Sequence, residues 1–413
     1  MTQLMTIKRL RAYAILMAAT LWSVWVVDLS IEGPVDRLGK VKGTDFLQFY
    51  AAGSLVRDRR WNDLYDVRAL YGVTRAIAPT SQETLFLPVQ SPQLALLFAP
   101  FARFPYPVAL TIWLGTIGVL YAGSCLALGR ICDALKDHRR LVVSSCLAYP
   151  GFYTLVINGQ TSGLSLVCLV GALLGIRGGR WFTAGLALGL LGFKPHWAAA
   201  AAAVFFVARE WRIVTGIIVA ACGQFALTWF VVGSSVMNAY GRVLQAIPKI
   251  ADLLEPKPGD SLRSYWGLIA PWKGLAWALY AATAFAAAVI AASIWRRHPA
   301  FEVRCSAVVL AIVLVSPHVL PYDLILLGPA FLLMANWFAK SGPSAPGKLS
   351  VALLGSFLAP LMTPLPALIR QQFSVGATAV ALLLLWRTTG SEAALGTHPE
   401  ASHGDAEECA GVV

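Results

Sequence analysis

The sequence predicts an all-helical membrane protein that crosses the bilayer several times. Of its 413 residues, 57% are hydrophobic and 13% are charged, whereas soluble domains carry about twice that share of charge. Continuous apolar runs recur along the chain, and a bilayer core of about 30 Å requires runs of this kind. Because the runs do not alternate with polar residues, the pattern excludes a transmembrane barrel.

The apolar runs predict about twelve transmembrane helices, within a range of about 10–13. They lie near residues 10–29, 108–129, 141–157, 163–176, 181–193, 195–208, 213–233, 274–294, 305–316, 322–339, 349–366 and 373–386. Basic residues gather in alternate connectors, which contain Lys8, Arg9, Arg11, Arg130, Lys136, Arg139, Arg140, Arg177, Arg180, Arg209, Arg212, Arg296, Arg297, Arg304, Lys340, Lys348 and Arg387. The positive-inside rule therefore predicts that both termini are cytoplasmic.

This topology predicts one transmembrane domain, residues 1–388, with two long outer loops at 30–107 and 234–273. Residues 389–413 are expected to form a disordered cytoplasmic tail. The net charge of +12 lies mostly in the connectors, so it indicates membrane orientation and not nucleic-acid binding. The seven cysteines form no CxxC pair, and none lies in the two long loops. Their positions indicate neither a disulfide framework nor a zinc site.

The first outer loop is expected to contain two amphipathic helices and a short apolar segment. Thr44 is expected to N-cap a helix beginning at Asp45, with Phe46, Phe49 and Tyr50 on a face that dips into lipid. The stretch WNDLYDVRALYGVTRAI predicts a second interfacial helix. The stretch SPQLALLFAPFARFPYP is too short to span a bilayer and is bounded by prolines, so we expect a re-entrant or interfacial segment.

Four polar features interrupt the apolar sequence, and the topology places all of them on the outer side. They are Asp45, NGQTSG at 158–163, GFKPH at 192–196 and SPHVLPYD at 316–323. Ionisable residues at membrane depth are costly and by default mark function. We therefore expect these features to converge on one site.

Lys194 precedes Pro195, which interrupts the helix, so the lysine is expected beside the start of the next helix. An ammonium group next to a helix N-terminus suits a phosphate. The alternative is a lysine that snorkels at a tight turn. His196 lies two residues further on and is a second candidate for substrate contact.

His318 lies between two prolines and is followed by Tyr322 and Asp323. Histidine and aspartate at the mouth of an apolar helix indicate a catalytic or substrate-binding role. The alternative is a His–Asp hydrogen bond that only caps the following helix.

The NGQTSG stretch offers both amides and hydroxyls. Asn158 and Gln160 have amide groups suited to sugar hydroxyls, whereas Thr161 or Ser162 is expected to cap the helix that follows.

Asp45 is separated from the other loop carboxylates by its surroundings. It lies in the first turn of an expected helix, where the helix dipole favours the ionised form, and aromatic residues flank it. An ionised carboxylate in a partly dry site is what a general base requires. The alternative is a solvated loop carboxylate without a specific role.

Five stretches, in this order along the chain, resemble glycosyltransferase family 87, the polyprenol-phosphate-sugar-dependent transferases of the GT-C class. They are GTDFLQFYAAGSLV…DLYD, SPQLALLFAPFARFPY, INGQTSGLSLVCLVGALL, AGLALGLLGFKPHWAA and VSPHVLPYDLILLGPA. The resemblance covers roughly residues 10–385. One departure is that the family often has Tyr-Pro-Pro where this chain has Gln90, Ser91 and Pro92.

The resemblance implies a GT-C-like fold with its site on the non-cytoplasmic face. It also implies a sugar donor, often mannose or arabinose, carried on a polyprenyl phosphate, and a loop carboxylate as general base. Carried onto this sequence, Asp45 matches that carboxylate and Lys194 meets the donor phosphate. His318 is then a second candidate base or phosphate contact.

The expected function is an inverting hexosyl- or pentosyltransferase that acts on a glycan or glycolipid hydroxyl at the periplasmic face of a bacterial inner membrane. We expect no cofactor and no metal, because the outer loops lack an Asp-x-Asp pair and Lys194 can stabilise a phosphate leaving group. The alternative is a transporter or a flippase for lipid-linked sugars, since broken helices also occur in carriers.

Overall fold

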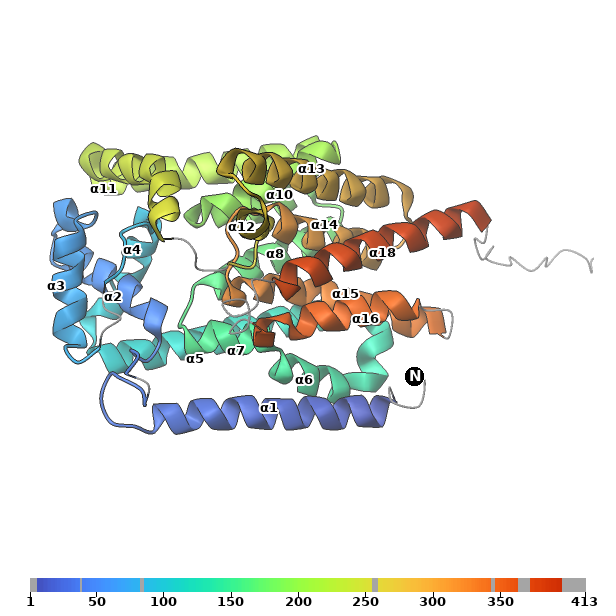
Figure 1. Cartoon of the computed structure of the whole chain (residues 1–413), viewed down its shortest axis with the longest axis horizontal. Helices are drawn as coiled ribbons and strands as arrows, with labels where there is room; N and C mark the ends of the chain where they lie inside the picture. Colours follow the sequence, from blue (N-terminus) through green and yellow to red (C-terminus); the bar gives the residue numbers. More distant parts are fainter. Residues whose placement is uncertain are drawn as a thin grey trace, which may run out of the picture.

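The computed structural model describes residues 6–37, 39–81, 85–254, 259–342, 346–362 and 372–395. The regular elements in these ranges are helices, and β pairing is confined there to one bridge between Val35 and Val41. Most long helices run along the long axis of the molecule (Figure 1). The start of α1 (Ile7–Leu29) and the end of α18 (Phe373–Leu395) lie at the same end (Figure 1). The all-helical prediction is confirmed.

The expected count of about twelve spans is not confirmed. Within the described ranges, five helical segments are long and apolar enough to cross a membrane: α1, α5 (Tyr106–Gly129), Trp211–Ile247 of α11 (Trp211–Leu254), α13 (Lys273–Arg297) and the segment Pro321–Ser341. That segment joins η5 (Pro321–Leu327) to α15 (Gly328–Ser341). A bent pair, Asp133–Ala148 with Pro150–Ile157, would be a sixth.

Most of the remaining apolar runs form shorter helices in the described ranges. Examples are α8 (Ser162–Arg177), α10 (Pro195–Val207) and α14 (Phe301–Val315), with 16, 13 and 15 residues. Helices of these lengths extend about 20–24 Å, less than a bilayer core of about 30 Å. Proline accounts for two of the breaks, because Pro195 opens α10 and Pro321 opens η5.

Two helices beside the polar breaks pack backbone to backbone through glycine. A Cβ atom on Gly185 of α9 (Trp181–Gly189) would lie 2.2 Å from the Ile213 oxygen of α11. A Cβ atom on Gly216 would lie 2.4 Å from the Phe182 oxygen. Small residues permit such close helix contacts in membranes. This contact fixes α9 and the turn η4 (Leu190–Phe193), which leads directly to Lys194.

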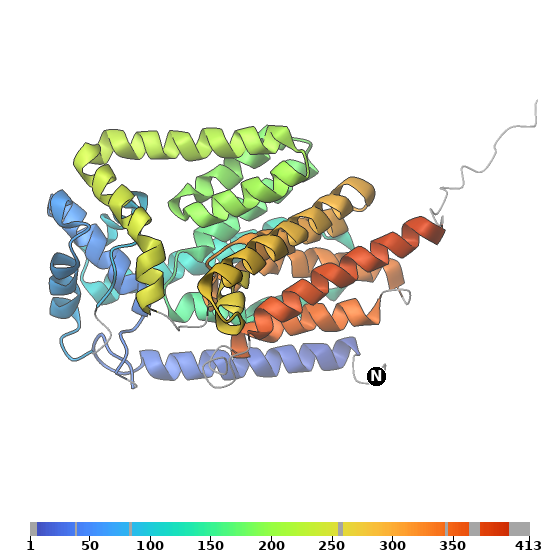
Figure 2. The same cartoon turned by 45° about the horizontal axis from the view of Figure 1, so that its top comes forward.

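The expected second outer loop, 234–273, is largely helical. After a kink at Gly233, where φ is 80°, α11 continues to Leu254, and α12 (Leu262–Ile269) follows. Figure 2 shows the part after the kink turning across the end of the molecule. There Ser235 donates a hydrogen bond to Asn62 (3.0 Å), and the rings of Tyr240 and Tyr65 lie 5.7 Å apart. The distal half of α11 therefore braces the first outer loop.

The first outer loop folds into short helices at one end of the molecule, on the left in Figure 1. They are α2 (Thr44–Arg57), η1 (Trp61–Asp63), α3 (Val67–Ile77), α4 (Pro92–Phe98) and η2 (Phe101–Arg103). The expected second helix is present as α3, and Asp66 caps it by accepting a hydrogen bond from the Arg68 amide (2.8 Å).

Two expectations for the first loop helix were wrong. The residue that caps α2 is Gly43, which adopts φ 64°, and the Thr44 hydroxyl donates to the Val41 oxygen instead. The aromatic face does not meet lipid, because Phe46 and Phe49 are 0% and 1% exposed. Both rings pack against Phe98 of α4. The neighbouring loop helices cover the face that the sequence pattern assigned to the bilayer.

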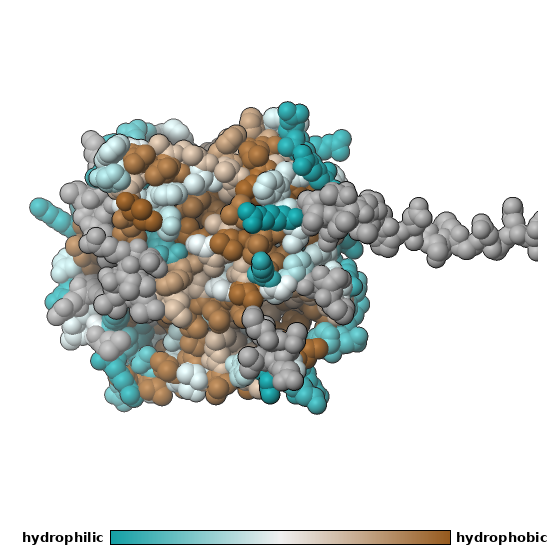
Figure 3. Space-filling view, turned by 45° about the vertical axis from the view of Figure 1, so that its right-hand side comes forward, coloured by the Kyte–Doolittle hydropathy of each residue, from teal (hydrophilic) through white to brown (hydrophobic). Residues whose placement is uncertain are grey.

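The outer surface of the helix bundle is strongly apolar. Large hydrophobic side chains such as Val119 of α5 and Phe230 of α11 are exposed by 73% and 88%. Figure 3 shows many hydrophobic residues over the middle of the visible face and most of the strongly hydrophilic residues toward its margins. A band of this kind is what a lipid-facing surface requires.

Candidate functional site

The N-terminus of α2 is held by the turn between α7 (Pro150–Ile157) and α8. The Asn158 carbonyl oxygen accepts hydrogen bonds from the amides of Asp45 (3.1 Å) and Phe46 (3.2 Å). Gly159, with φ 60°, lies so close that an added Cβ would be 2.8 Å from the Phe46 Cβ. The Trp113 indole donates to the Gly159 oxygen (2.8 Å). A backbone carbonyl thus satisfies the helix start that a side chain was expected to cap.

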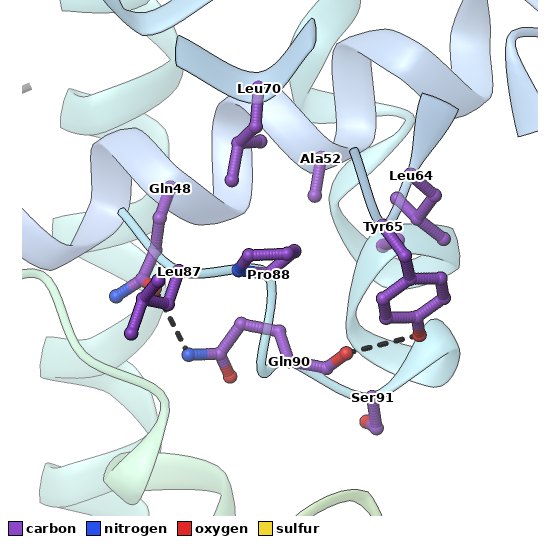
Figure 4. Close-up of a pocket in the computed structure, with 10 residues that line it drawn as sticks. Gln48, Ala52, Leu64, Tyr65, Leu70, Leu87, Pro88, Gln90 and Ser91 are labelled. Atoms are coloured by element: carbon purple, nitrogen blue, oxygen red, sulfur yellow. Dashed lines mark hydrogen bonds between the residues drawn. The ribbon is translucent and has the colours of Figure 1, made fainter. Parts of the chain in front are cut away.

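Amide groups hold both oxygens of the Asp45 carboxylate. Gln160 Nε2 donates to Oδ2 (3.0 Å), and Gln48 Nε2 donates to Oδ1 (3.4 Å). Gln48 is held in turn by Gln90 Nε2 (3.1 Å), and the Tyr65 hydroxyl donates to the Gln90 carbonyl (3.2 Å), as Figure 4 shows. The small pocket between these residues has a volume of about 10 Å³, about enough for one water molecule. The carboxylate is therefore fixed in orientation before any substrate binds.

Opposing effects act on the pKa of Asp45, and their net result is a raised pKa. Burial raises the pKa of Asp45 and outweighs the opposing effects of the Gln160 hydrogen bond and the positive charge of Lys194. The negative charge of Asp323 also raises this pKa, and the Tyr322 hydroxyl lowers it. A carboxylate with a raised pKa is, when ionised, a stronger base than a solvated one.

Lys194 forms a buried ion pair that the sequence did not predict. Its Nζ lies 3.0 Å from Asp323 Oδ1, and the two side chains are 11% and 2% exposed. Lys194 also donates to the Ser162 hydroxyl (2.9 Å), and Ser162 donates to Asp323 Oδ1 (2.5 Å). The Lys194 ammonium lies 5.5 Å from the centre of the Tyr322 ring. The lysine therefore points into the protein and does not snorkel.

This cluster corrects two expectations about helix capping. Neither Thr161 nor Ser162 caps α8 through its side chain, because the Ser162 hydroxyl is directed to Asp323. Asp323 does cap η5, since its Oδ2 accepts from the Leu320 amide (3.2 Å). Its other partners are Lys194 and Ser162, so the expected alternative of a hydrogen bond from His318 is not what holds it.

The two histidines lie beside this cluster. The rings of His196 and His318 meet edge to face, with centroids 5.8 Å apart. His196 Nε2 is buried and has no hydrogen-bond partner, whereas His318 is exposed. The structure thus leaves an unsatisfied imidazole nitrogen next to an accessible imidazole.

Asp260, which the sequence analysis did not single out, anchors the His318 segment. Its amide donates to the Val319 oxygen (2.7 Å), and the neighbouring Ser261 hydroxyl donates to the Pro317 oxygen (3.0 Å). The Asp260 carboxylate accepts from Ser374, and burial raises its pKa to about 6. In the sequence Asp260 resembles any acid in a polar turn, so no local signal distinguishes it. Gln48 was also missed, although its i+3 spacing from Asp45 predicts contact on one helix face.

The structure brings all four polar features together. Asp45 contacts Gln160, Ser162 joins Lys194 to Asp323, and His196 contacts His318. The Asn158 side chain stays apart, because its Nδ2 donates to the Thr154 oxygen (2.7 Å). Among the residues that the structure describes, no group of three or more His, Cys, Asp or Glu side chains is arranged to hold a metal ion.

Comparison with known proteins identifies the family. The profile of glycosyltransferase family 87 matches residues 90–317, more than half of the chain. The match includes Gln160 and Lys194 and leaves out Asp45, His318 and Asp323. Neither a curated protein nor a solved structure matches the chain significantly. The chain belongs to glycosyltransferase family 87, and this membership implies a membrane glycosyltransferase.

Proposed function

We propose that the protein transfers a sugar, mannose or arabinose, from a polyprenyl-phosphate donor to an acceptor hydroxyl on the periplasmic face of a bacterial inner membrane. The observation that carries the proposal is the Asp45 carboxylate, which two amides orient beside the Lys194–Asp323 pair. A fixed carboxylate and a cation in adjacent positions match the two needs of the reaction, which are a base for the acceptor and a contact for the donor phosphate.

Asp45 is the proposed general base. It takes the proton of the acceptor hydroxyl while that oxygen attacks the anomeric carbon of the donor sugar. The bond from this carbon to the phosphate oxygen breaks, and polyprenyl phosphate leaves with the bonding electrons. A single displacement of this kind inverts the anomeric configuration.

Lys194 is the proposed contact for the donor phosphate. A lysine has three N–H donors, and contacts with Ser162 and Asp323 use two of them. The third can reach a phosphate oxygen, and the start of α10 at Pro195 adds a positive helix end. The leaving group is already a phosphate ester, so these groups supply the positive charge for which other transferases use a metal. His318 is the proposed second contact, and Gln160, Tyr322 and His196 line the sugar site.

The test is a transfer assay with the purified chain in lipid nanodiscs. Polyprenyl-phosphate mannose, arabinose and glucose are supplied with glycolipid acceptors, and free polyprenyl phosphate and the glycosylated product are quantified. We expect one donor to be consumed with formation of a product of inverted configuration. Movement of the intact donor across proteoliposomes without sugar transfer would instead establish a flippase and overturn the proposal.

A further inference from the structure

A second hollow lies far from the candidate site, between α16 (Gly347–Leu358) and the last turns of α18. These ends lie at the right in Figure 1, opposite the loop helices α2, α3 and α4. The cavity has a volume of about 360 Å³ and is lined by Pro346–Leu349 from one side and Leu384, Arg387 and Thr388 from the other. Pockets for small ligands are typically about 300–1,000 Å³ in volume, so the hollow is large enough for a phospholipid headgroup.

The charged side chains that line this hollow, among those the structure describes, are positive. Lys348 and Arg387 come from different helices, both are exposed, and none of the described lining residues is a carboxylate. Neither side chain has a hydrogen bond or an ion pair with another residue in the described ranges. Lysines nearby do form such pairs, as Lys340 does with Glu302 (2.6 Å). Two unpaired cations across a cavity favour an anionic ligand, and arginine binds phosphate through paired N–H groups.

The residues around the hollow favour a lipid ligand over a soluble anion. Its lining is partly apolar, since it includes the buried side chain of Leu349 and that of Leu384. Trp386, adjacent to Arg387, is 43% exposed, and tryptophan is enriched at membrane–water interfaces. One and two turns back along α18, Leu383 and Val380 are exposed as well. A phosphate in the hollow would therefore have an apolar helix surface leading from it into the bilayer.

We propose that this hollow binds the phosphate group of an anionic phospholipid such as phosphatidylglycerol. Lys348 and Arg387 hold the phosphate oxygens from opposite sides, and the acyl chains lie along α18 past Leu383. The site is separate from the candidate catalytic site, and the proposal does not depend on the proposed function.

The test is native mass spectrometry of the delipidated full chain in detergent, titrated with dioleoyl phosphatidylglycerol. Dioleoyl phosphatidylcholine and inorganic phosphate are titrated in parallel. The variants are Lys348→Gln with Arg387→Gln, and, as a matched control, Arg139→Gln with Arg140→Gln, two exposed cations elsewhere in the basic connectors. A third variant neutralises Glu400, Asp405, Glu407 and Glu408 of the C-terminal tail by amide substitution in the full chain. Thermal unfolding checks that each variant is folded.

We expect phosphatidylglycerol to bind in preference to phosphatidylcholine. Near a membrane surface each lysine or arginine changes affinity for anionic lipid by about fivefold, so the Lys348/Arg387 variant should bind about 30-fold more weakly. The Arg139/Arg140 variant should bind as the unmodified chain does. Equal affinity for the two lipids, an equal loss in the control variant, or competition by millimolar phosphate would each overturn the lipid assignment. Phosphatidylglycerol binding that appears only after the tail is neutralised would overturn it too, because the tail would then be the occupant.

Discussion

Loss of both partners of the Lys194–Asp323 pair should destabilise the protein by less than the sum of the two single losses. Asp323 is almost completely buried, and Lys194, Ser162 and the Leu320 amide are its donors. The Lys194→Met variant leaves a buried carboxylate without its cation, and Asp323→Asn leaves a buried ammonium without its anion. Removal of one partner of a buried pair costs about 3–5 kcal/mol. In the double variant no unpaired charge remains, so we expect a coupling free energy of about 2–3 kcal/mol.

The assay is a double-mutant cycle on the free energy of unfolding in mixed micelles. The 14 tryptophans of the chain report unfolding by fluorescence. The matched control is the pair Lys136–Asp133, whose side chains are 67% and 65% exposed, and we expect no measurable coupling there because solvent screens an exposed pair. If the single variants at Lys194 and Asp323 are additive to within about 0.5 kcal/mol, the ion pair does not organise the site and the reasoning fails.

Three further outcomes follow from the packing and the charges. Gly216→Leu should prevent stable folding, because its Cβ would lie 2.4 Å from the Phe182 oxygen. The control Gly115→Ala, with no atom within 4 Å of the added Cβ, should keep the melting temperature. Gln160→Leu removes a hydrogen bond that lowers the pKa of Asp45, so the acidic limb of the pH–rate profile should move to higher pH. An unchanged acidic limb would show that ionisation of Asp45 does not control the rate of transfer. The pKa of Asp260, about 6 against an ordinary 3.8, means that its neutral form favours folding below pH 4 and that this contribution is lost as the pH rises through 6. The free energy of unfolding of Asp260→Asn, relative to that of the unmodified chain, should therefore increase by about 2–3 kcal/mol from pH 4 to pH 7. Denaturant titration at both pH values measures this, and a difference in unfolding free energy that does not change with pH would contradict it.

The convergence of the polar features was predictable because broken apolar helices leave few places for ionisable groups. Asp45, Lys194 and His318 each stand out from apolar or proline-rich neighbours, and the structure places them near one another. The residues with which they interact were harder to predict from the sequence. Asp323 pairs with Lys194 across 129 positions of sequence, and no periodicity in a single chain encodes such a contact.

Local rules failed where tertiary packing replaced them. The sequence rule for helix starts selected Thr44, but the Asn158 carbonyl already satisfies the first amides of α2 and Gly43 supplies the turn. The aromatic spacing of Phe46 and Phe49 was read correctly as one face. The sequence could not tell that α4, and not lipid, covers this face.

The expected number of about twelve spans is not confirmed, because several apolar runs form helices shorter than a bilayer core. The runs around α8, α10 and α14 are apolar enough to be counted, yet the structure ends each helix after 13–16 residues. The proline that opens α10 at residue 195 is visible in the sequence. Its effect on span length depends on how the broken helices pack, which only the fold reveals.

The most direct test of the account compares Asp45→Asn with His318→Gln in single-turnover transfer by the purified chain. If Asp45 is the base, Asp45→Asn should slow transfer by about 10²–10⁴-fold while donor binding is retained. His318→Gln should mainly weaken donor binding, and Asp58→Asn, which alters an exposed carboxylate at the other end of α2, should have no effect. Near-normal turnover by Asp45→Asn would contradict the central claim, above all if His318→Gln abolished transfer.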